Sequence, residues 1–333
     1  MTETFSQESL KKLVAHWVPA QSQNQPFRIY RDTSNFFSIE YGDIVILNDT
    51  PYLIRHNTKE GRFGLDDEVK FWVKRAVDLT TGKAKIIKLV FHEKFIARIG
   101  DISFECFRSP LKEARILNLV GSRPNFMHGV SVRDDHGNVV RILDAIYGIT
   151  LADHVWDLAS RIDHETYFYQ YFPEIFDNYI ECAEAIRFLH EAGEKHGDIR
   201  RDHVLVDRDS GVYRWIDFDY NFRHRENIYG YDLFGLGNVL MFLVGMGDML
   251  VPHLRTAKPD IYARLSDNDT NIVFNNRVAN LIKIYPYIPE DLNGILMHFS
   301  KSANVFYDQT YQLLDDLYEF KSDFFKKEIT NES

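Results

Sequence analysis

The stretch of sequence that decides the fold is His196-Gly-Asp-Ile-Arg-Arg-Asp-His203, which runs directly into Val-Leu-Val-Asp207. A turn at Asp209-Ser-Gly and the segment YRWIDFD (213–219) follow. Apolar residues that alternate on both sides of a turn predict a short β-hairpin. In the preceding segment, 172–191, apolar residues recur every three or four positions and predict a long amphipathic helix. The pattern therefore places one aspartate on a loop after a helix and another at the end of a strand.

The first 146 or so residues of the sequence are mostly β, and the sequence from 231 onward is mainly helical. Strands are predicted at 36–47, 51–55, 69–77, 84–91, 128–134 and 138–148, and helices at 6–17 and 110–120. We divide the chain into an N-terminal extension (1–50), a β-rich lobe (51–146) and a helical lobe (147–333). The predicted fold class is α+β, with two lobes and a ligand cleft between them.

The composition excludes several classes of protein. The 333 residues are 45% hydrophobic, enough to bury a large core, so a disordered chain is excluded. A net charge of −10 argues against nucleic acid as a partner. With two cysteines, Cys106 and Cys182, and no signal peptide in the polar first residues, we expect a reduced, cytoplasmic location. The apolar segment 233–251 contains Asn238 and Asp248 and is interpreted as a buried helix, not a membrane span.

The decisive stretch resembles the core of the protein-kinase-like phosphotransferases, whose catalytic loop reads H-R-D-L-x-x-x-N and whose metal motif reads D-F-G. The resemblance implies that Asp198 is the catalytic aspartate and Asp217 the metal-binding one. Arg200 stands where the family usually has a lysine that steadies the transferred phosphate. Taken singly, Asp198 fits a turn residue and Asp217 a solvated carboxylate at a strand end. Their order and spacing favour the functional interpretation.

Two further residues follow the family's order upstream. Lys88 in Ile86-Ile-Lys-Leu resembles the strand lysine of V-A-I-K, and Glu113 resembles the helix glutamate that pairs with it. The gap between them is somewhat long but compatible with a loop insertion, and Glu105 is the weaker alternative partner. Each residue alone would pass for an ordinary exposed charge.

Adenine would be bound at the end of the β-rich lobe. Arg141-Ile-Leu-Asp-Ala-Ile-Tyr-Gly148 resembles the hinge between the two lobes of the family. The resemblance implies Leu143 as gatekeeper, with the Asp144 carbonyl and the Ile146 backbone facing adenine. The alternative is an edge strand that leads into a helix.

The phosphate-binding loop is the weakest match. Glu60-Gly-Arg-Phe-Gly-Leu-Asp-Asp-Glu-Val69 is similar to G-x-G-x-x-G-x-V at Gly64, with Gly61 before it. Asp67 takes the place of the last glycine, and a carboxylate beside a triphosphate is electrostatically unfavourable. A plain β-turn fits this segment nearly as well.

The metal site also departs from the family. His203 occupies the asparagine position, and imidazole suits softer metals better than Mg²⁺. Asp202 or Asp219 is a candidate for the missing oxygen ligand. Asp219 also replaces the glycine of D-F-G.

The segment after the metal motif is short. Only fourteen residues lie between Asp217 and Asp232, and none is serine or threonine. Asp232 lies in Tyr231-Asp-Leu-Phe-Gly-Leu-Gly, which resembles a family helix whose aspartate bonds to the catalytic-loop backbone. The short segment and the H-G-D loop are also similar to the aminoglycoside- and choline-type phosphotransferases.

The resemblance implies an ATP- and Mg²⁺-dependent phosphotransferase, with Mn²⁺ as an alternative metal. The first expectation is a bacterial-type Ser/Thr protein kinase acting on a protein hydroxyl. The alternatives are a small-molecule kinase and a pseudokinase that serves as a nucleotide-binding regulatory module. Residues 1–50 lie outside the resemblance. We expect their helix to pack on the β-rich lobe, and a docking site for a partner is the alternative.

Overall fold

The computed structural model describes residues 5–17, 26–60, 68–99, 102–223 and 227–331. Its chain forms two compact units. The first comprises Met1–Glu93, Arg108–Arg123 and Met127–Ile146, and the second comprises Lys94–Phe107, Pro124–Phe126 and Tyr147–Ser333. The first unit is mainly β and the second mainly helical, so the predicted α+β class, with a β-rich N-terminal part and a helical C-terminal part, is confirmed.

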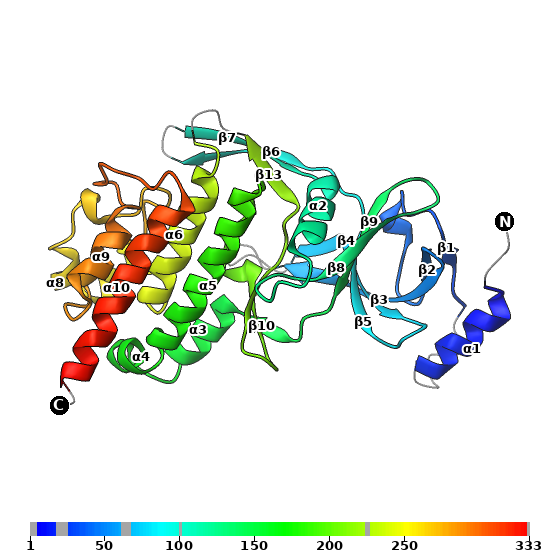
Figure 1. Cartoon of the computed structure of the whole chain (residues 1–333), viewed down its shortest axis with the longest axis horizontal. Coiled ribbons are helices and arrows are strands. Elements are labelled where there is room, and N and C mark those ends of the chain that lie inside the picture. Colours follow the sequence, from blue (N-terminus) through cyan, green and yellow to red (C-terminus); the bar gives the residue numbers. More distant parts are fainter. Residues whose placement is uncertain (1–4, 18–25, 61–67, 100–101, 224–226, 332–333) are drawn as a thin grey trace. The chain divides into compact units, whose positions relative to one another are not determined.

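The first unit is built on a seven-stranded sheet with the strand order β1-β2-β3-β4-β5-β9-β8. Its strands are β1 (Ile29–Tyr30), β2 (Ile44–Leu47), β3 (Thr50–Glu60), β4 (Glu68–Asp78), β5 (Ala84–Lys88), β8 (Gly129–Arg133) and β9 (Val139–Asp144). Its helices are α1 (Gln7–Trp17), the 3-10 turn η2 (Phe36–Ser38) and α2 (Pro110–Val120). All pairs are antiparallel except β1 with β2. Helix α2 packs against β8 and β9 (Figure 1).

Helix α1 is an integral part of the first unit. The Ser6 hydroxyl accepts a hydrogen bond from the Ser9 backbone N–H at 3.1 Å and so caps the helix. Leu10 and Val14 are buried in a cluster with Ile44, Ile46, Leu53 and Leu79. The Trp17 indole N–H donates to the Leu79 carbonyl at 2.9 Å. The apolar face of the N-terminal helix is therefore packed on the β-rich unit.

Shortening Leu10 to alanine is expected to lower the free energy of unfolding by about 2–4 kcal/mol, because the side chain is fully buried and its removal leaves a cavity. Urea denaturation measures the effect. Lys11→Ala on the exposed face of the same helix is the matched control, with a change expected within about 0.5 kcal/mol. Equal stability of the two variants would show that α1 does not pack on the sheet.

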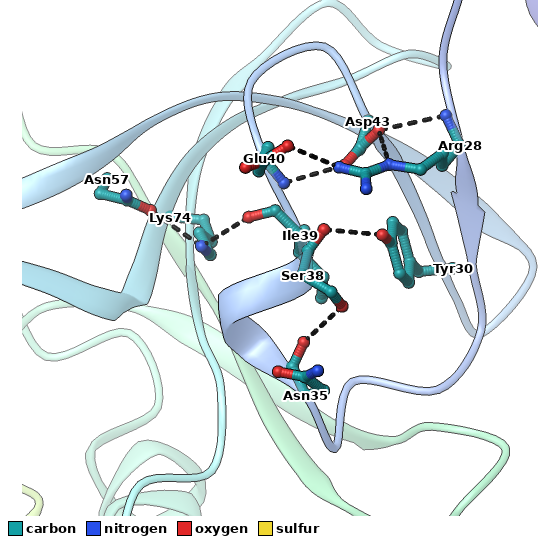
Figure 2. Close-up of polar contacts among 9 residues, drawn as sticks. All are labelled: Arg28, Tyr30, Asn35, Ser38, Ile39, Glu40, Asp43, Asn57 and Lys74. Carbon is teal, nitrogen blue, oxygen red and sulfur yellow. Dashed lines mark hydrogen bonds and ion pairs between the residues drawn. The ribbon is translucent and has the colours of Figure 1, made fainter.

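The segment between β1 and β2 departs from the prediction. Phe36–Ser38 forms a 3-10 turn and not the start of a strand. Figure 2 shows that side chains bind the backbone carbonyls of Ser38 and of Ile39, the residue that follows the turn. The Tyr30 hydroxyl donates to the Ser38 carbonyl at 2.6 Å, and the Lys74 ammonium donates to the Ile39 carbonyl at 2.8 Å and to Asn57 at 2.8 Å. Burial lowers the pKa of Lys74 to about 8.

The second unit is a helical body with two small sheets. Its helices are α3 (Leu151–Ala159), α4 (His164–Gln170), α5 (Phe172–Glu191), α6 (Gly230–Val244), α7 (Val251–Ala257), α8 (Pro259–Tyr262), α9 (Glu290–Met297) and α10 (Thr310–Asn331). Short 3-10 turns are η3 (Arg201–His203), η4 (Asp267–Asp269) and η5 (Leu281–Lys283). One sheet has the order β10-β11-β12, formed by β10 (Gly148–Thr150), β11 (Val204–Asp207) and β12 (Tyr213–Trp215).

Helices α5 and α6 form the centre of this unit. Helix α5 packs against α6, α10 and β12. The apolar segment after residue 230 forms α6, most of whose side chains are buried, so it belongs to the protein core. No described helix is long and apolar enough to cross a membrane. Gly235 of α6 lies so close to Ile199 that an added Cβ would come within 2.6 Å of that side chain. The loop that carries Asp198 therefore rests directly on α6.

The segment between β5 and α2 is not the loop that the sequence suggested. It forms two antiparallel strands, β6 (Lys94–Ile99) and β7 (Ile102–Arg108). Strand β7 is the centre of a three-stranded sheet with the order β13-β7-β6, where β13 is Tyr220–Arg223 (Figure 1). Phe104 and Cys106 of β7 are buried against Phe222. Of the two inserted strands, β7 therefore pairs with the segment that follows Asp217.

Candidate functional site

In the first unit the strand and the helix bring Lys88 and Glu113 together. The Ser109 hydroxyl accepts from the Lys112 backbone N–H at 3.2 Å, and Pro110 occupies the first turn, so α2 begins at a fixed position. Glu113 then lies on the buried face of α2. The Lys88 ammonium donates to Glu113 Oε1 at 2.7 Å, and the two residues are 2% and 0% exposed. Glu105, the alternative partner, lies on β7, with Oε2 4.0 Å from Arg223 Nη1.

A third charged residue completes this cluster and was not singled out from the sequence. Arg141 of β9 is paired in register with Lys88 of β5. Its Nε donates to Glu113 Oε2 at 2.9 Å, and the residue is 1% exposed. The available signal was a single arginine inside the otherwise apolar strand Val139-Val-Arg-Ile-Leu143. A buried charge in such a strand indicates a buried partner.

In the second unit the loop and the hairpin bring Asp198, Arg200, His203 and Asp217 together. His203 Nδ1 lies 3.5 Å from Asp198 Oδ2, and His203 Nε2 lies 3.5 Å from Asp217 Oδ2. Arg200 Nε lies 3.4 Å from Asp198 Oδ1. The Ile216 backbone N–H donates to the His203 carbonyl at 2.9 Å and so ties the end of the hairpin to the loop. The side chains of Asp198 and Asp217 remain 19% and 16% exposed and are accessible to a ligand.

The hydrogen bonds of His203 define its proton position. Nδ1 lies 2.8 Å from the Asp198 carbonyl oxygen, which only accepts, so Nδ1 carries a proton. Nε2 contacts the Arg200 guanidinium, which only donates, so Nε2 is the acceptor. These contacts place the Nε2 side of the ring toward Arg200.

The buried carboxylate of Asp232 holds the loop that carries Asp198. Asp232 of α6 accepts from the His196 backbone N–H at 2.7 Å and from the Gly197 backbone N–H at 2.8 Å. His190 Nε2 donates to the same carboxylate at 3.0 Å. Burial opposes the charge, but these hydrogen bonds and the neighbouring histidines hold the pKa of Asp232 below its ordinary value. Gly197 has φ +89°, a conformation that favours glycine, which accounts for a glycine just before Asp198.

Asp217 has an unusual backbone. Its φ is +67°, a region that non-glycine residues seldom adopt and that costs of the order of 1–3 kcal/mol. Such conformations persist only where the surroundings impose them, and they occur often at functional sites. Asp219, two residues later, is buried, and Asp202 lies in η3 beside His203. Among the described residues no group of three or more His, Cys, Asp or Glu side chains is placed to hold a metal ion.

The residues expected to face adenine lie at the end of the first unit. Leu143 is buried on β9 and paired with Ile86 of β5 and Gly129 of β8. The Asp144 side chain is exposed and forms an ion pair with Lys85 at 2.5 Å. Ile146 is the last residue of the first unit. Gly61 and Gly64, the candidate phosphate-loop glycines, lie outside the described residues.

No protein-family model matches the chain, and no curated protein matches its sequence. The solved kinase domain of PknI from Mycobacterium tuberculosis is 13% identical, with a TM-score of 0.44, over 85% of this chain and 99% of that chain. A single mutant of that domain gives 13% identity and a TM-score of 0.47, over 85% and 98% of the two chains. A double mutant gives 12% identity and a TM-score of 0.48, over 85% and 99%.

Proposed function

We propose that the chain is an ATP- and Mg²⁺-dependent phosphotransferase that moves the γ-phosphate to a hydroxyl group, and that its acceptor is a serine or threonine of a protein. The observation that carries the proposal is the convergence of Asp198 and Asp217 on the two nitrogens of His203, with Arg200 beside Asp198. Phosphoryl transfer depends mainly on positioning and on electrostatic stabilisation. A fixed group of carboxylates and cations supports that chemistry.

Each residue has a proposed task. Asp198 orients the acceptor hydroxyl and accepts its proton, because its carboxylate is partly exposed and the loop that carries it is bonded to Asp232. Arg200 stabilises the charge on the transferred phosphate. Lys88 binds the α- and β-phosphates, and Glu113 orients it at 2.7 Å. For adenine we propose Leu143 as gatekeeper, together with the Asp144 carbonyl and the backbone of Ile146. Gly61 and Gly64 stay candidates for the phosphate loop.

The Asp217 carboxylate is a suitable ligand for Mg²⁺. Magnesium is usually bound by one or two carboxylates together with substrate phosphates and water, so a complete protein ligand set is not required. Bound Mg²⁺ would neutralise charge on the phosphate oxygens. His203 fits poorly, because its acceptor nitrogen is taken by Arg200 and imidazole suits softer metals. Asp202 and Asp219 remain the candidates for a second oxygen ligand, and Mn²⁺ the alternative ion.

A second function, a pseudokinase that binds nucleotide without transfer, is favoured by one observation. Arg200 contacts His203. His203 occupies the position at which the protein-kinase-like family carries a metal-binding asparagine. A guanidinium there opposes the binding of a second cation, and a chain with this arrangement can act as a nucleotide-regulated module.

Labelled ATP distinguishes these functions. The full chain is incubated with γ-labelled ATP and Mg²⁺ or Mn²⁺, with dephosphorylated casein as a protein acceptor and with choline and kanamycin as small acceptors. Label on serine or threonine supports the proposal. Label found only on choline or kanamycin would support phosphotransferase activity but would overturn the proposal that the acceptor is a protein. A thermal shift with ATP but no transfer supports the pseudokinase, and neither binding nor transfer overturns both functions.

A further inference from the structure

The buried cluster of Lys88, Glu113 and Arg141 contains a residue with no assigned role. We propose that Arg141 is a positioning residue that fixes the Glu113 carboxylate and, through it, holds Lys88 ready for the phosphates of ATP. The inference rests on the proposed function, because it concerns the same nucleotide site. It adds that Glu113 is held by the sheet itself, independently of any ligand.

Backbone carbonyls of the sheet hold the guanidinium of Arg141. Its Nη1 donates to the Val139 carbonyl at 2.8 Å, and its Nη2 donates to the Leu89 carbonyl at 3.2 Å. Val139 begins β9, and Leu89 directly follows β5, so the guanidinium links two neighbouring strands. The remaining Nε–H is then directed at Glu113 Oε2, at 2.9 Å. A planar guanidinium supplies three such donors in a rigid arrangement, which a lysine ammonium does not.

The two oxygens of Glu113 have different partners. Oε1 accepts from Lys88 at 2.7 Å and Oε2 accepts from Arg141 at 2.9 Å. Rotation of the carboxylate would break at least one of these charge-assisted bonds, and a buried charge that loses a partner is unfavourable. Since Arg141 is fixed by backbone carbonyls, the carboxylate has one favoured orientation. That orientation presents Oε1 to Lys88.

The arrangement also ties three elements together. Lys88 ends β5, Glu113 lies in the first turn of α2, and Arg141 lies in β9. All three side chains are at most 3% exposed, so water does not screen the interactions strongly. Helix α2 is therefore held against the sheet by charge as well as by its apolar face. Displacement of α2 away from Lys88 would leave both cations without this carboxylate.

The role predicts a specific pattern of ligand affinities. Arg141→Met is expected to weaken ATP binding by roughly 10- to 100-fold, the change that corresponds to the loss of one charge-assisted hydrogen bond. Adenosine has no phosphates for Lys88 to bind. Its binding affinity is therefore expected to change by less than about threefold, within the effect of a neutral contact. Because Arg141 acts through Glu113, the double variant Glu113→Gln with Arg141→Met is expected to bind ATP no more weakly than Glu113→Gln alone.

Calorimetry with ATP–Mg²⁺ and with adenosine on the full chain tests the proposal, after circular dichroism has verified folding. Arg133→Met is the matched control, because Arg133 is an exposed arginine of the neighbouring strand β8 that bonds to the Gly137 carbonyl. If Arg141→Met fails to fold, Arg141→Lys replaces it. The lysine keeps the charge but lacks the planar set of guanidinium donors, and the same comparison of ATP with adenosine applies.

Three results would overturn the role of Arg141: unchanged ATP affinity, equal losses of ATP and adenosine affinity, or additive effects of the two substitutions. Equal losses would identify a purely structural residue. Failure of the wild-type chain to bind ATP would overturn the proposed function together with this inference. ATP binding by the wild type with no effect of Arg141→Met would overturn the inference alone.

Discussion

The substitution Asp198→Asn is expected to reduce phosphate transfer by at least about 10²- to 10⁴-fold, the usual contribution of a general base. Asparagine has nearly the shape of aspartate but cannot accept the proton of the acceptor hydroxyl. ATP affinity is expected to stay within about threefold, because the backbone bonds that position the loop do not involve the Asp198 side chain. Transfer of labelled phosphate and calorimetric ATP binding are measured on the same preparation.

Asp209→Asn supplies the control for this experiment. Asp209 is an exposed residue of the turn after β11, and its substitution should leave transfer unchanged. Normal turnover in Asp198→Asn would remove Asp198 from the mechanism. A parallel loss of transfer and of ATP binding would instead indicate a distorted loop.

The second large effect is expected at Asp232. Its carboxylate accepts from two consecutive backbone N–H groups of the loop and from His190, and it is fully buried. Asparagine offers one oxygen and turns an N–H₂ group toward N–H donors. Asp232→Asn should therefore lower the free energy of unfolding by roughly 2–4 kcal/mol. Transfer should fall by at least about 10²-fold, because the loop that carries Asp198 loses its support.

The pH dependence of stability gives an independent check on Asp232. Its pKa in the folded chain is depressed, so the carboxylate stabilises the fold at every pH above its unfolded value of about 3.9. This contribution is lost as the pH falls through the folded pKa. The stability of Asp232→Asn should therefore fall less steeply than that of the wild type below about pH 4. Identical acid-denaturation slopes would contradict the assignment, and Asp157→Asn, at an exposed ion pair on α3, is the control.

The features that the sequence predicted well are those with local causes. Helices were expected at 110–120 and 172–191, and α2 and α5 have these bounds. In α2 the Ser109 cap, Pro110 and the apolar spacing all lie within the segment itself. The proximity of Asp198 and Asp217 also followed from local structure, since a short hairpin returns the chain to the loop.

The features that the sequence did not predict depend on distant partners. The turn at Phe36–Ser38 is stabilised by Tyr30 and by Lys74, a residue of β4 far along the chain. Strands β6 and β7, which looked like a loop insertion, pair with each other, and β7 also pairs with β13, which follows more than a hundred residues later. Periodicity in a short segment does not reveal such pairings.

Arg141 shows the same limit at the candidate site. Its three donors reach Val139, Leu89 and Glu113, two of which are distant in sequence. The Lys88–Glu113 pair could be anticipated from a family motif, whereas the arginine has no counterpart in that motif. Only the register of β5 with β9 places Arg141 opposite Lys88.

A crystal structure of the full chain with Mg²⁺ and a non-hydrolysable ATP analogue would show whether the nucleotide binds at the proposed residues. We expect an Asp217 oxygen to bind Mg²⁺, Lys88 to contact the α- or β-phosphate, and Asp198 to stay clear of the metal and face the position of an acceptor. We also expect Arg141 to keep its bond to Glu113. An analogue bound with its phosphates away from both Lys88 and Asp217 would contradict the proposed function.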